Sequence, residues 1–247
     1  MLKFLRKIRQ KSINENKTIN YLKYAIGEIV LVVIGILIAL QINNWNEKKK
    51  NHNLVNIYQQ GLIENLSSDS LNISRMIDNV KRDLEKTHEF ELRVSKSSKP
   101  FDTILKIARY EYNFRIAVNY NYENDTYLIL NSTGHLSLFN NDLIRELSEL
   151  YNLQKKALFA MEKTYDNYSR VAILYSQKYP FCFESNLIQN GTVAASEVWN
   201  NISLANHATE FNSLIINKSD CYRLELEVLP LILEKTNKLL RKLRKKT

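Results

Sequence analysis

The sequence predicts an all-α protein in which one N-terminal membrane-spanning helix is followed by a bundle of long helices. Three observations lead to this prediction. An uninterrupted apolar run lies near the N-terminus, apolar residues then recur at three- and four-residue steps, and the 247 residues include only five glycines and three prolines. Apolar residues at such steps lie on one face of a helix. Scarce glycine and proline argue against a β-rich fold, which needs many tight turns.

The apolar run extends from Tyr24 to Trp45, and every residue from Ile29 to Leu40 is apolar or glycine. The part from Tyr24 to Ile42 would measure roughly 28 Å as a helix, which is close to the thickness of the hydrocarbon layer of a bilayer. This length argues against a buried strand, since strands rarely exceed about eight residues. The aromatic residues at the two ends fit the positions of an aromatic belt. The run therefore predicts a transmembrane helix.

The charges beside the run predict its orientation. The first 24 residues carry seven lysines and arginines against one glutamate, whereas the other flank carries Lys48, Lys49 and Lys50 beside Glu47. The more positive flank stays in the cytoplasm. No small-x-small cleavage site follows the run, so we interpret it as an uncleaved signal anchor. The expected organisation is a basic cytoplasmic tail (1–23), a transmembrane helix (24–45) and a helical domain outside the cytoplasm (46–247).

Two features of the predicted membrane helix are candidates for function. Gly27, Gly35 and Ala39 share one face, and the spacing of Gly35 and Ala39 lets a second helix approach closely. The alternative is that small residues are simply common in such helices. Glu28 lies about one turn inside the apolar run, where acids are costly and often act as proton relays or partner sites. It could instead reach the headgroup layer and pair with Lys23 or a lipid amine.

The residues around this helix also carry a resemblance. The opening FLRKIRQK, from Phe4, and the stretch NKTINYLKYAIGEIVLVVIGILIALQINNWNE, which ends at Glu47, resemble the N-terminal signature of an uncharacterised family of flavobacterial single-pass membrane proteins, a domain of unknown function. The resemblance is looser between Ser132 and Tyr151. It implies a Gram-negative inner membrane with the helical domain in the periplasm. The family has no assigned activity to carry over.

The remaining chain predicts a series of helices separated by short breaks. We expect one helix to reach about Val94, where it can be continuous with the membrane helix, and to end at Ser97–Pro100. A second helix is expected from Asp102, as its cap, to about Val118, and a short third one from Thr126 to Ser132. A long helix should follow from Asn140 or Asn141, as its cap, to about Tyr175, and a short one within Val193–Trp199. The last helix should begin near Ala205–Glu210 and run almost to the last residue, with Pro230 kinking or splitting it.

The two cysteines, Cys182 and Cys221, lie in the part expected outside the cytoplasm, where thiols are oxidised by default. A disulfide would tie the irregular link Tyr179–Phe183 to the last helix. Closing such a loop would stabilise the fold by roughly 3–4 kcal/mol. Two buried free thiols are the alternative.

The distribution of charge argues against a nucleic-acid-binding protein. The formal net charge is +9. The basic excess, however, lies in the N-terminal tail and in the last seven residues, which leaves a body close to neutral. Basic ends fit anionic lipid surfaces better than they fit nucleic acid.

No set of residues predicts a reaction. The four histidines, His52, His88, His135 and His207, are far apart and lack metal-ligand spacing. No phosphate-cradling glycine loop and no Gly-x-Ser-x-Gly elbow occurs. We therefore expect neither an enzyme nor a bound cofactor or metal ion.

An aromatic-rich region offers a candidate binding surface. Tyr110, Tyr112, Phe114, Tyr120 and Tyr122 lie close together in sequence and could bind sugar, peptide or peptidoglycan. Aromatic packing at one end of the bundle is the alternative.

The expected function is that of a membrane-tethered periplasmic scaffold or interaction module. It would associate with the bilayer and with itself or another membrane protein, through its bundle surfaces and the Gly35/Ala39 face. One alternative is an accessory subunit of a proton-coupled inner-membrane complex, with Glu28 as the protonated group. Another is a periplasmic ligand sensor that uses the tyrosine-rich region.

Overall fold

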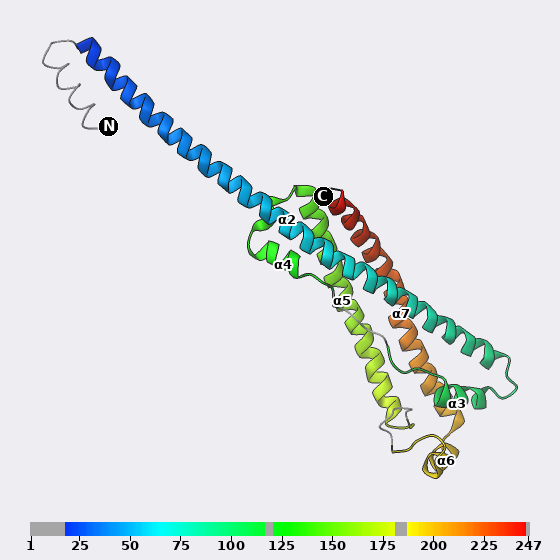
Figure 1. Cartoon of the computed structure of the whole chain (residues 1–247). Coiled ribbons are helices and arrows are strands. Elements are labelled where there is room, and N and C mark those ends of the chain that lie inside the picture. The colour runs from blue at the N-terminus through cyan, green and yellow to red at the C-terminus, as the bar shows by residue number, and fades with distance from the viewer. Residues whose placement is uncertain (1–17, 117–120, 181–186, 246–247) are drawn as a thin grey trace. The chain divides into compact units, whose positions relative to one another are not determined.

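A computed structural model describes residues 18–116, 121–180 and 187–245. All regular elements in these residues are helical, as the sequence predicted (Figure 1). They are α2 (Thr18–Ser95), α3 (Pro100–Tyr110), α4 (Asp125–Ser132), the 3-10 helix η1 (His135–Leu138), α5 (Asn141–Ser176), α6 (Val193–Asn200) and α7 (Leu204–Arg244). The chain divides into two units, residues 1–57 and 58–247, and α2 contributes to both.

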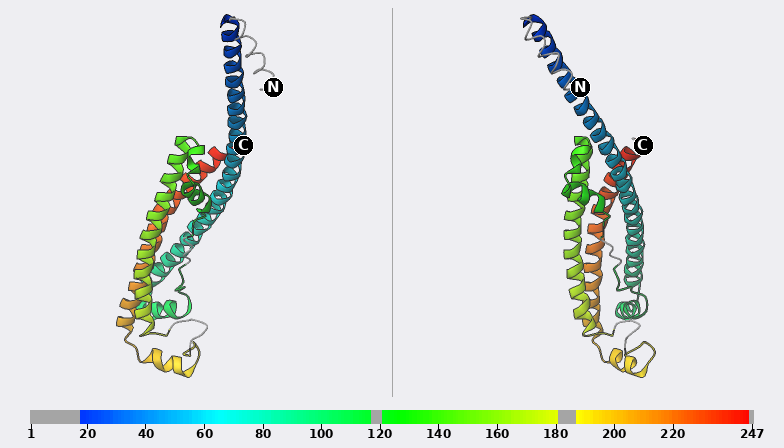
Figure 2. Two further views of the ribbon diagram at one scale, coloured as in Figure 1. Left: turned by 90° about the vertical axis from the view of Figure 1, so that its left-hand side faces the viewer. Right: turned by 60° about the vertical axis from the view of Figure 1, so that its left-hand side comes forward.

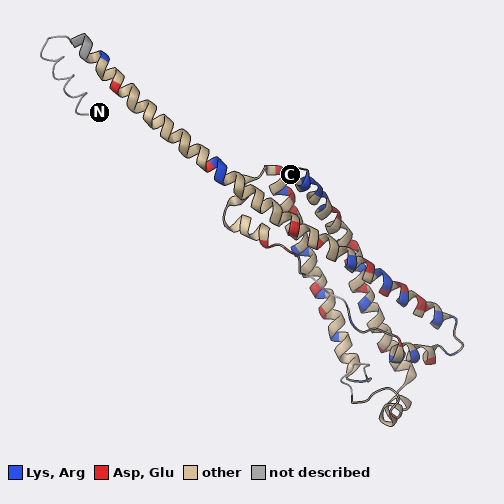
Figure 3. Cartoon of the chain, viewed as in Figure 1, with Lys and Arg blue, Asp and Glu red and all other residues tan. Residues whose placement is uncertain are grey.

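The described part of the first unit is the N-terminal stretch of α2. From Ile26 to Lys50 every residue is exposed, and Figure 3 shows a long part of this stretch without charged residues. Its most apolar window of 18 residues has a mean hydropathy of 2.6, and none of that window is buried. Water would solvate so large an apolar surface poorly. By length and composition, the helix is therefore able to cross a membrane.

The second unit is a bundle built on three long helices, α5, α7 and the part of α2 from Tyr58 onward (Figure 2). Helices α5 and α7 run antiparallel and pack together, and α3 also packs against α7. The short elements lie at the bundle ends, with α3 and α6 at one end and α4 and η1 at the other. This arrangement confirms the predicted bundle of long helices.

Two hydrophobic clusters form the core of the bundle. The α4-end cluster joins α2, α4, the first half of α5 and the second half of α7, with Leu66, Leu147 and Ile232 among its buried members. The α3-end cluster joins α3, the second half of α5, α6 and the first half of α7, and it is rich in aromatic residues such as Tyr175 and Phe211. Because α5 and α7 contribute to both clusters, they connect the two ends of the bundle.

Local signals explain where several helices begin. The Asn140 side chain accepts a hydrogen bond from the Leu143 N–H at 2.8 Å, which confirms the cap predicted for α5. Gly134 has a φ of 73°, a left-handed conformation that follows α4 and precedes η1. Helix α6 begins after Thr192, whose hydroxyl accepts from the Ala195 N–H.

Helix α3 differs from its prediction at both ends. It begins at Pro100, a residue suited to the first turn, so Asp102 lies inside the helix and is not its cap. It ends at Tyr110, well before Val118, which itself lies outside the described residues. The following residues, 112–116, form no helix, and two of their carbonyl groups, those of Asn113 and Phe114, bond to side chains of α7 and α5 instead.

Helix α7 is continuous from Leu204 to Arg244, so the predicted split at Pro230 is wrong, whereas the alternative, a kink at Pro230, stays a prediction. The proline lies inside the helix between Leu229 and Ile232, which are both buried in the α4-end cluster. Packing on both sides of Pro230 therefore offsets the loss of one backbone donor.

Helix α4 approaches α2 closely at Gly61. A Cβ atom at this position would lie 2.8 Å from Oγ1 of Thr126, closer than side-chain atoms pack. One turn further along α2, Asn65 Oδ1 accepts a hydrogen bond from the Thr126 N–H at 3.2 Å. Gly61 and Asn65 thus seat the first turn of α4 on α2.

Candidate functional site

An ion pair between a buried lysine and a partly buried aspartate lies at the centre of a polar site in the bundle. Asp83 comes from α2, whereas Lys218 and Tyr222 come from successive turns of α7. The Lys218 Nζ lies 2.9 Å from Asp83 Oδ2, and the Tyr222 hydroxyl donates to the same oxygen at 2.5 Å. The Lys218 side chain is only 5% exposed. One carboxylate is therefore held by two donors from α7.

Lys218 also fixes the chain segment 111–116 that follows α3. Its Nζ donates to the backbone carbonyl of Asn113 at 2.5 Å. The Tyr168 hydroxyl of α5 donates to the carbonyl of the next residue, Phe114, at 2.7 Å. Side chains from α7 and α5 thus satisfy carbonyl groups that an extended segment would otherwise leave without partners.

The electrostatics of this site follow from its burial. Burial lowers the pKa of Lys218, while the Asp83 carboxylate acts in the opposite direction. Burial raises the pKa of Tyr222, and Asp83 reinforces that shift, so the phenol stays protonated and donates. The rings of Tyr112 and Tyr222 lie 5.0 and 5.4 Å from the Lys218 ammonium group and stabilise its charge.

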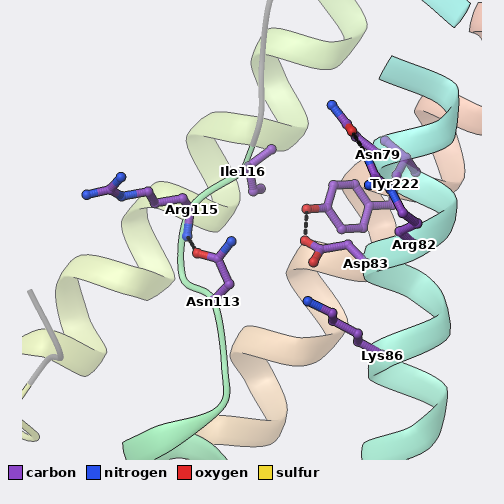
Figure 4. A pocket seen from close by; sticks show the side chains of 9 residues that line it. Asn79, Arg82, Asp83, Lys86, Asn113, Arg115, Ile116 and Tyr222 are labelled. Carbon is purple, nitrogen blue, oxygen red and sulfur yellow. Dashed lines mark hydrogen bonds between the residues drawn. The ribbon is translucent and has the colours of Figure 1, made fainter. Parts of the chain in front are cut away.

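A cavity of ≈ 460 Å³ opens beside this ion pair (Figure 4). It lies between α2, the segment 111–116 and α7. Figure 4 shows Lys86 pointing toward the segment, with Asp83 and Tyr222 facing it and Arg115 turned outward. The lining residues are Asn79, Val80, Arg82, Asp83, Lys86, Asn113, Arg115, Ile116 and Tyr222.

A second, more apolar hollow of ≈ 300 Å³ lies between α2, α3 and α7. Phe90, Ile104, Phe211 and Ile215 are among its lining residues. It borders the α3-end cluster and offers fewer polar groups than the cavity beside Asp83. We therefore treat the Asp83 cavity as the candidate site.

Comparison with known protein families relates most of this chain to an uncharacterised family. The model of a family of unknown function (DUF6090) matches residues 28–205, which is most of the chain. The chain belongs to the DUF6090 family. No curated protein and no solved structure matches it. The match to DUF6090 includes Asp83 and Asn113 of the candidate site, whereas Lys218 and Tyr222 follow the matched range.

The site residues predicted for the apolar N-terminal stretch all lie within α2 of this DUF6090 chain. Glu28 is exposed, as are Gly27, Gly35 and Ala39. A Cβ atom at Gly27 or Gly35 would meet no atom within 4 Å. The roles assigned to Glu28 and to the small-residue face stay predictions, because they concern a lipid environment or a second helix.

Of the two cysteines, only Cys221 lies among the described residues. Cys221 is buried in the α3-end cluster, where burial raises the pKa of its thiol to about 11. Cys182 lies outside the described residues. The proposed disulfide between them therefore stays a prediction.

The tyrosine-rich region does not form one surface. Tyr112 and Phe114 pack in the α3-end cluster, whereas Tyr122 packs against the α4-end cluster. Tyr110 is exposed, and Tyr120 lies outside the described residues. The described members thus behave mainly as core residues, which is the packing alternative.

The four histidines lie at separate places. His52 and His88 are exposed, and His135 accepts or donates a hydrogen bond of 2.8 Å with the Tyr58 hydroxyl. His207 is fully buried and lies 2.8 Å from the Tyr175 hydroxyl. Burial lowers the pKa of His207 to about 4, so it is neutral at physiological pH.

The buried polar residues were not predicted from the sequence, although the sequence carries a signal for them. Lys218 and Glu225 occupy positions in α7 where the three- and four-residue apolar spacing continues through Leu214, Cys221 and Leu229. Asp69 in α2 and Gln154 in α5 interrupt their apolar faces in the same way. A charged or amide residue on such a face indicates a buried polar contact.

Proposed function

We propose that this chain is a non-enzymatic interaction module tethered to a membrane by α2. The observation that carries the proposal is the fully exposed apolar stretch of α2, followed by a separately packed helical bundle. An exposed apolar helix is stable in lipid, where its backbone groups are satisfied internally. The Asp83 carboxylate is engaged by Lys218 and Tyr222, so this acid is a structural group and not a free general base.

The proposal includes a location and an orientation. The seven basic residues of the first 24 support a cytoplasmic N-terminus, with residues 46–247 in the periplasm of a Gram-negative cell. The resemblance of the region from Phe4 to Glu47 to the flavobacterial signature supports the inner membrane as the site. The bilayer is then the first partner, and a second copy or another membrane protein is the second.

Membrane attachment is tested by extraction of membranes with alkaline carbonate. The full chain is expected to stay in the pellet. A variant with Ile34→Lys and Leu37→Lys places two charges in the apolar stretch and should move to the supernatant, because each charge near the bilayer centre costs about 3 kcal/mol. Val55→Lys, outside the stretch, serves as the control. Release of the unaltered chain by carbonate would contradict the proposal.

The small-residue face of α2 supports self-association. The space around Gly27 and Gly35 is open in the described chain, so a second helix can approach there. Replacing Gly35 and Ala39 by leucine should reduce dimer formation in cross-linked native membranes. Val33→Leu, on another face of the helix, should leave it unchanged. Equal cross-linking in all three proteins would exclude this face as the contact, and mass spectrometry of the cross-linked material would identify any other partner.

A further inference from the structure

We propose that the cavity beside Asp83 binds a small solute that carries a phosphate or carboxylate group. This inference goes beyond membrane tethering, since it gives the helical body a ligand. It rests on the charge of the cavity lining, on the size and polarity of the cavity, and on the hydrogen bonds that hold the segment 111–116.

The lining carries more positive than negative charge. Arg82, Lys86 and Arg115 are cationic, and Asp83 is the single acid among the lining residues. The charge of Asp83 is already paired with that of Lys218, which is not a lining residue. Within the described residues, none of the three lining cations forms an ion pair. A cavity with this excess charge favours an anion.

Lys86 is placed to make the principal contact. Its side chain points across the opening toward the segment 111–116 (Figure 4). Arg82 lies on the preceding turn of α2, where it donates to the Asn79 side chain. Arg115 is turned outward, so its contribution to the field is weaker than that of Lys86.

The size and polarity of the cavity fit a small metabolite better than a lone ion. Its volume of ≈ 460 Å³ lies within the range of small-molecule sites. The Tyr222 ring, Val80 and Ile116 provide apolar surface, while the side chains of Asn79 and Asn113 provide amide donors and acceptors. A ligand with one anionic group and a compact polar body would use all of these groups.

One wall of the cavity, the segment 111–116, is held by hydrogen bonds from within the chain. Asn113 is fixed through its backbone by Lys218, and its side chain accepts a hydrogen bond from the Arg115 N–H at 3.0 Å. Phe114 is fixed by Tyr168. A site that is ordered beforehand loses less entropy when it binds.

The test is calorimetric titration of the full chain in non-ionic detergent with inorganic phosphate and, separately, with citrate. We expect at least one of these anions to bind. Comparing the dissociation constants for phosphate and citrate distinguishes a phosphate site from a carboxylate site. Lys86→Gln should weaken binding by about tenfold, the loss of one charge-assisted contact. Lys81→Gln removes an exposed lysine from the same helix outside the cavity and should leave the affinity nearly unchanged.

Two results would overturn the proposal. The first is the absence of binding of both anions. The second is an equal effect of Lys86→Gln and Lys81→Gln, which would mean a general attraction to basic surface. A second measurement follows acetylation of the two lysines by mass spectrometry. The bound anion should slow the modification of Lys86 and leave that of Lys81 unaffected.

Discussion

Lys218 on α7 and Asp83 on α2 form an ion pair of 2.9 Å in which the lysine side chain is almost completely buried. The same ammonium group holds the carbonyl of Asn113. One side chain thus joins the last long helix to the first and to the segment that follows α3. Loss of this contact should therefore affect both the stability of the bundle and the wall of the candidate site.

Replacing Lys218 with methionine should destabilise the bundle by about 3 kcal/mol, because Asp83 would lose its cation in a mostly buried position. The free energy of unfolding is measured by denaturant titration of the detergent-solubilised chain. The double variant Lys218→Met/Asp83→Leu should recover much of the loss. A single variant as stable as the parent, or a double variant no better than the single one, would show that the pair contributes little.

His207 should make the fold sensitive to mild acid. Its pKa falls from 6.5 to about 4 on burial, so the unfolded chain binds a proton in this pH range and the folded chain does not. Stability is complete above the unfolded pKa and decreases as the pH falls from 6.5 toward 4, by up to about 3 kcal/mol. In the His207→Gln variant, this decrease of stability between pH 6.5 and 4 should disappear. An unchanged pH dependence in that variant would assign the acid sensitivity to other groups.

Asp69 should respond to pH in the opposite direction. Burial raises its pKa above 3.8, although hydrogen bonds from the Glu123 N–H and from Gln154 act against the shift. As the pH rises, the Asp69 carboxyl therefore stays protonated to a higher pH in the folded state than in the unfolded state. Its contribution to the free energy of unfolding is present at low pH and is lost as the pH rises through the pKa of the folded state.

Asp69→Asn removes this dependence and retains an acceptor for the Glu123 N–H. Near neutral pH we expect the variant to be as stable as the parent or more stable, by up to about 1 kcal/mol. Thermal unfolding at two pH values measures the difference. A marked loss of stability near neutral pH would mean that the carboxylate is needed in its charged form.

Gly61 should tolerate no side chain while Thr126 faces it. Gly61→Ala gains helix propensity of about 1 kcal/mol but introduces a contact that costs about 1–3 kcal/mol. The single variant should therefore be less stable than the parent. In a Thr126→Ala background the same change should instead stabilise the bundle. Additive effects of the two substitutions would show that α4 shifts freely on α2.

The sequence predicted the helical elements better than the polar site, for a physical reason. Helix existence follows from local spacing, and the Asn140 cap and the break at Gly134 are local signals. The end of α3 is decided by Tyr168 and Lys218, which are far away in sequence. The partner of a buried charge such as Asp83 is likewise set by the packing of α2 against α7. The sequence signal for such a contact is a polar residue, such as Lys218, that interrupts the apolar face of a helix.

The central claim, a membrane-tethered module with its helical body outside the cytoplasm, is tested most directly by labelling single cysteines with a membrane-impermeant maleimide. In a Cys182→Ser/Cys221→Ser background, Ser98→Cys adds a thiol at an exposed position after α2, and Ser12→Cys adds one in the basic tail. We predict that Ser98→Cys reacts in intact spheroplasts and Ser12→Cys reacts only after lysis. The reverse pattern, or equal labelling of both without lysis, would contradict the account.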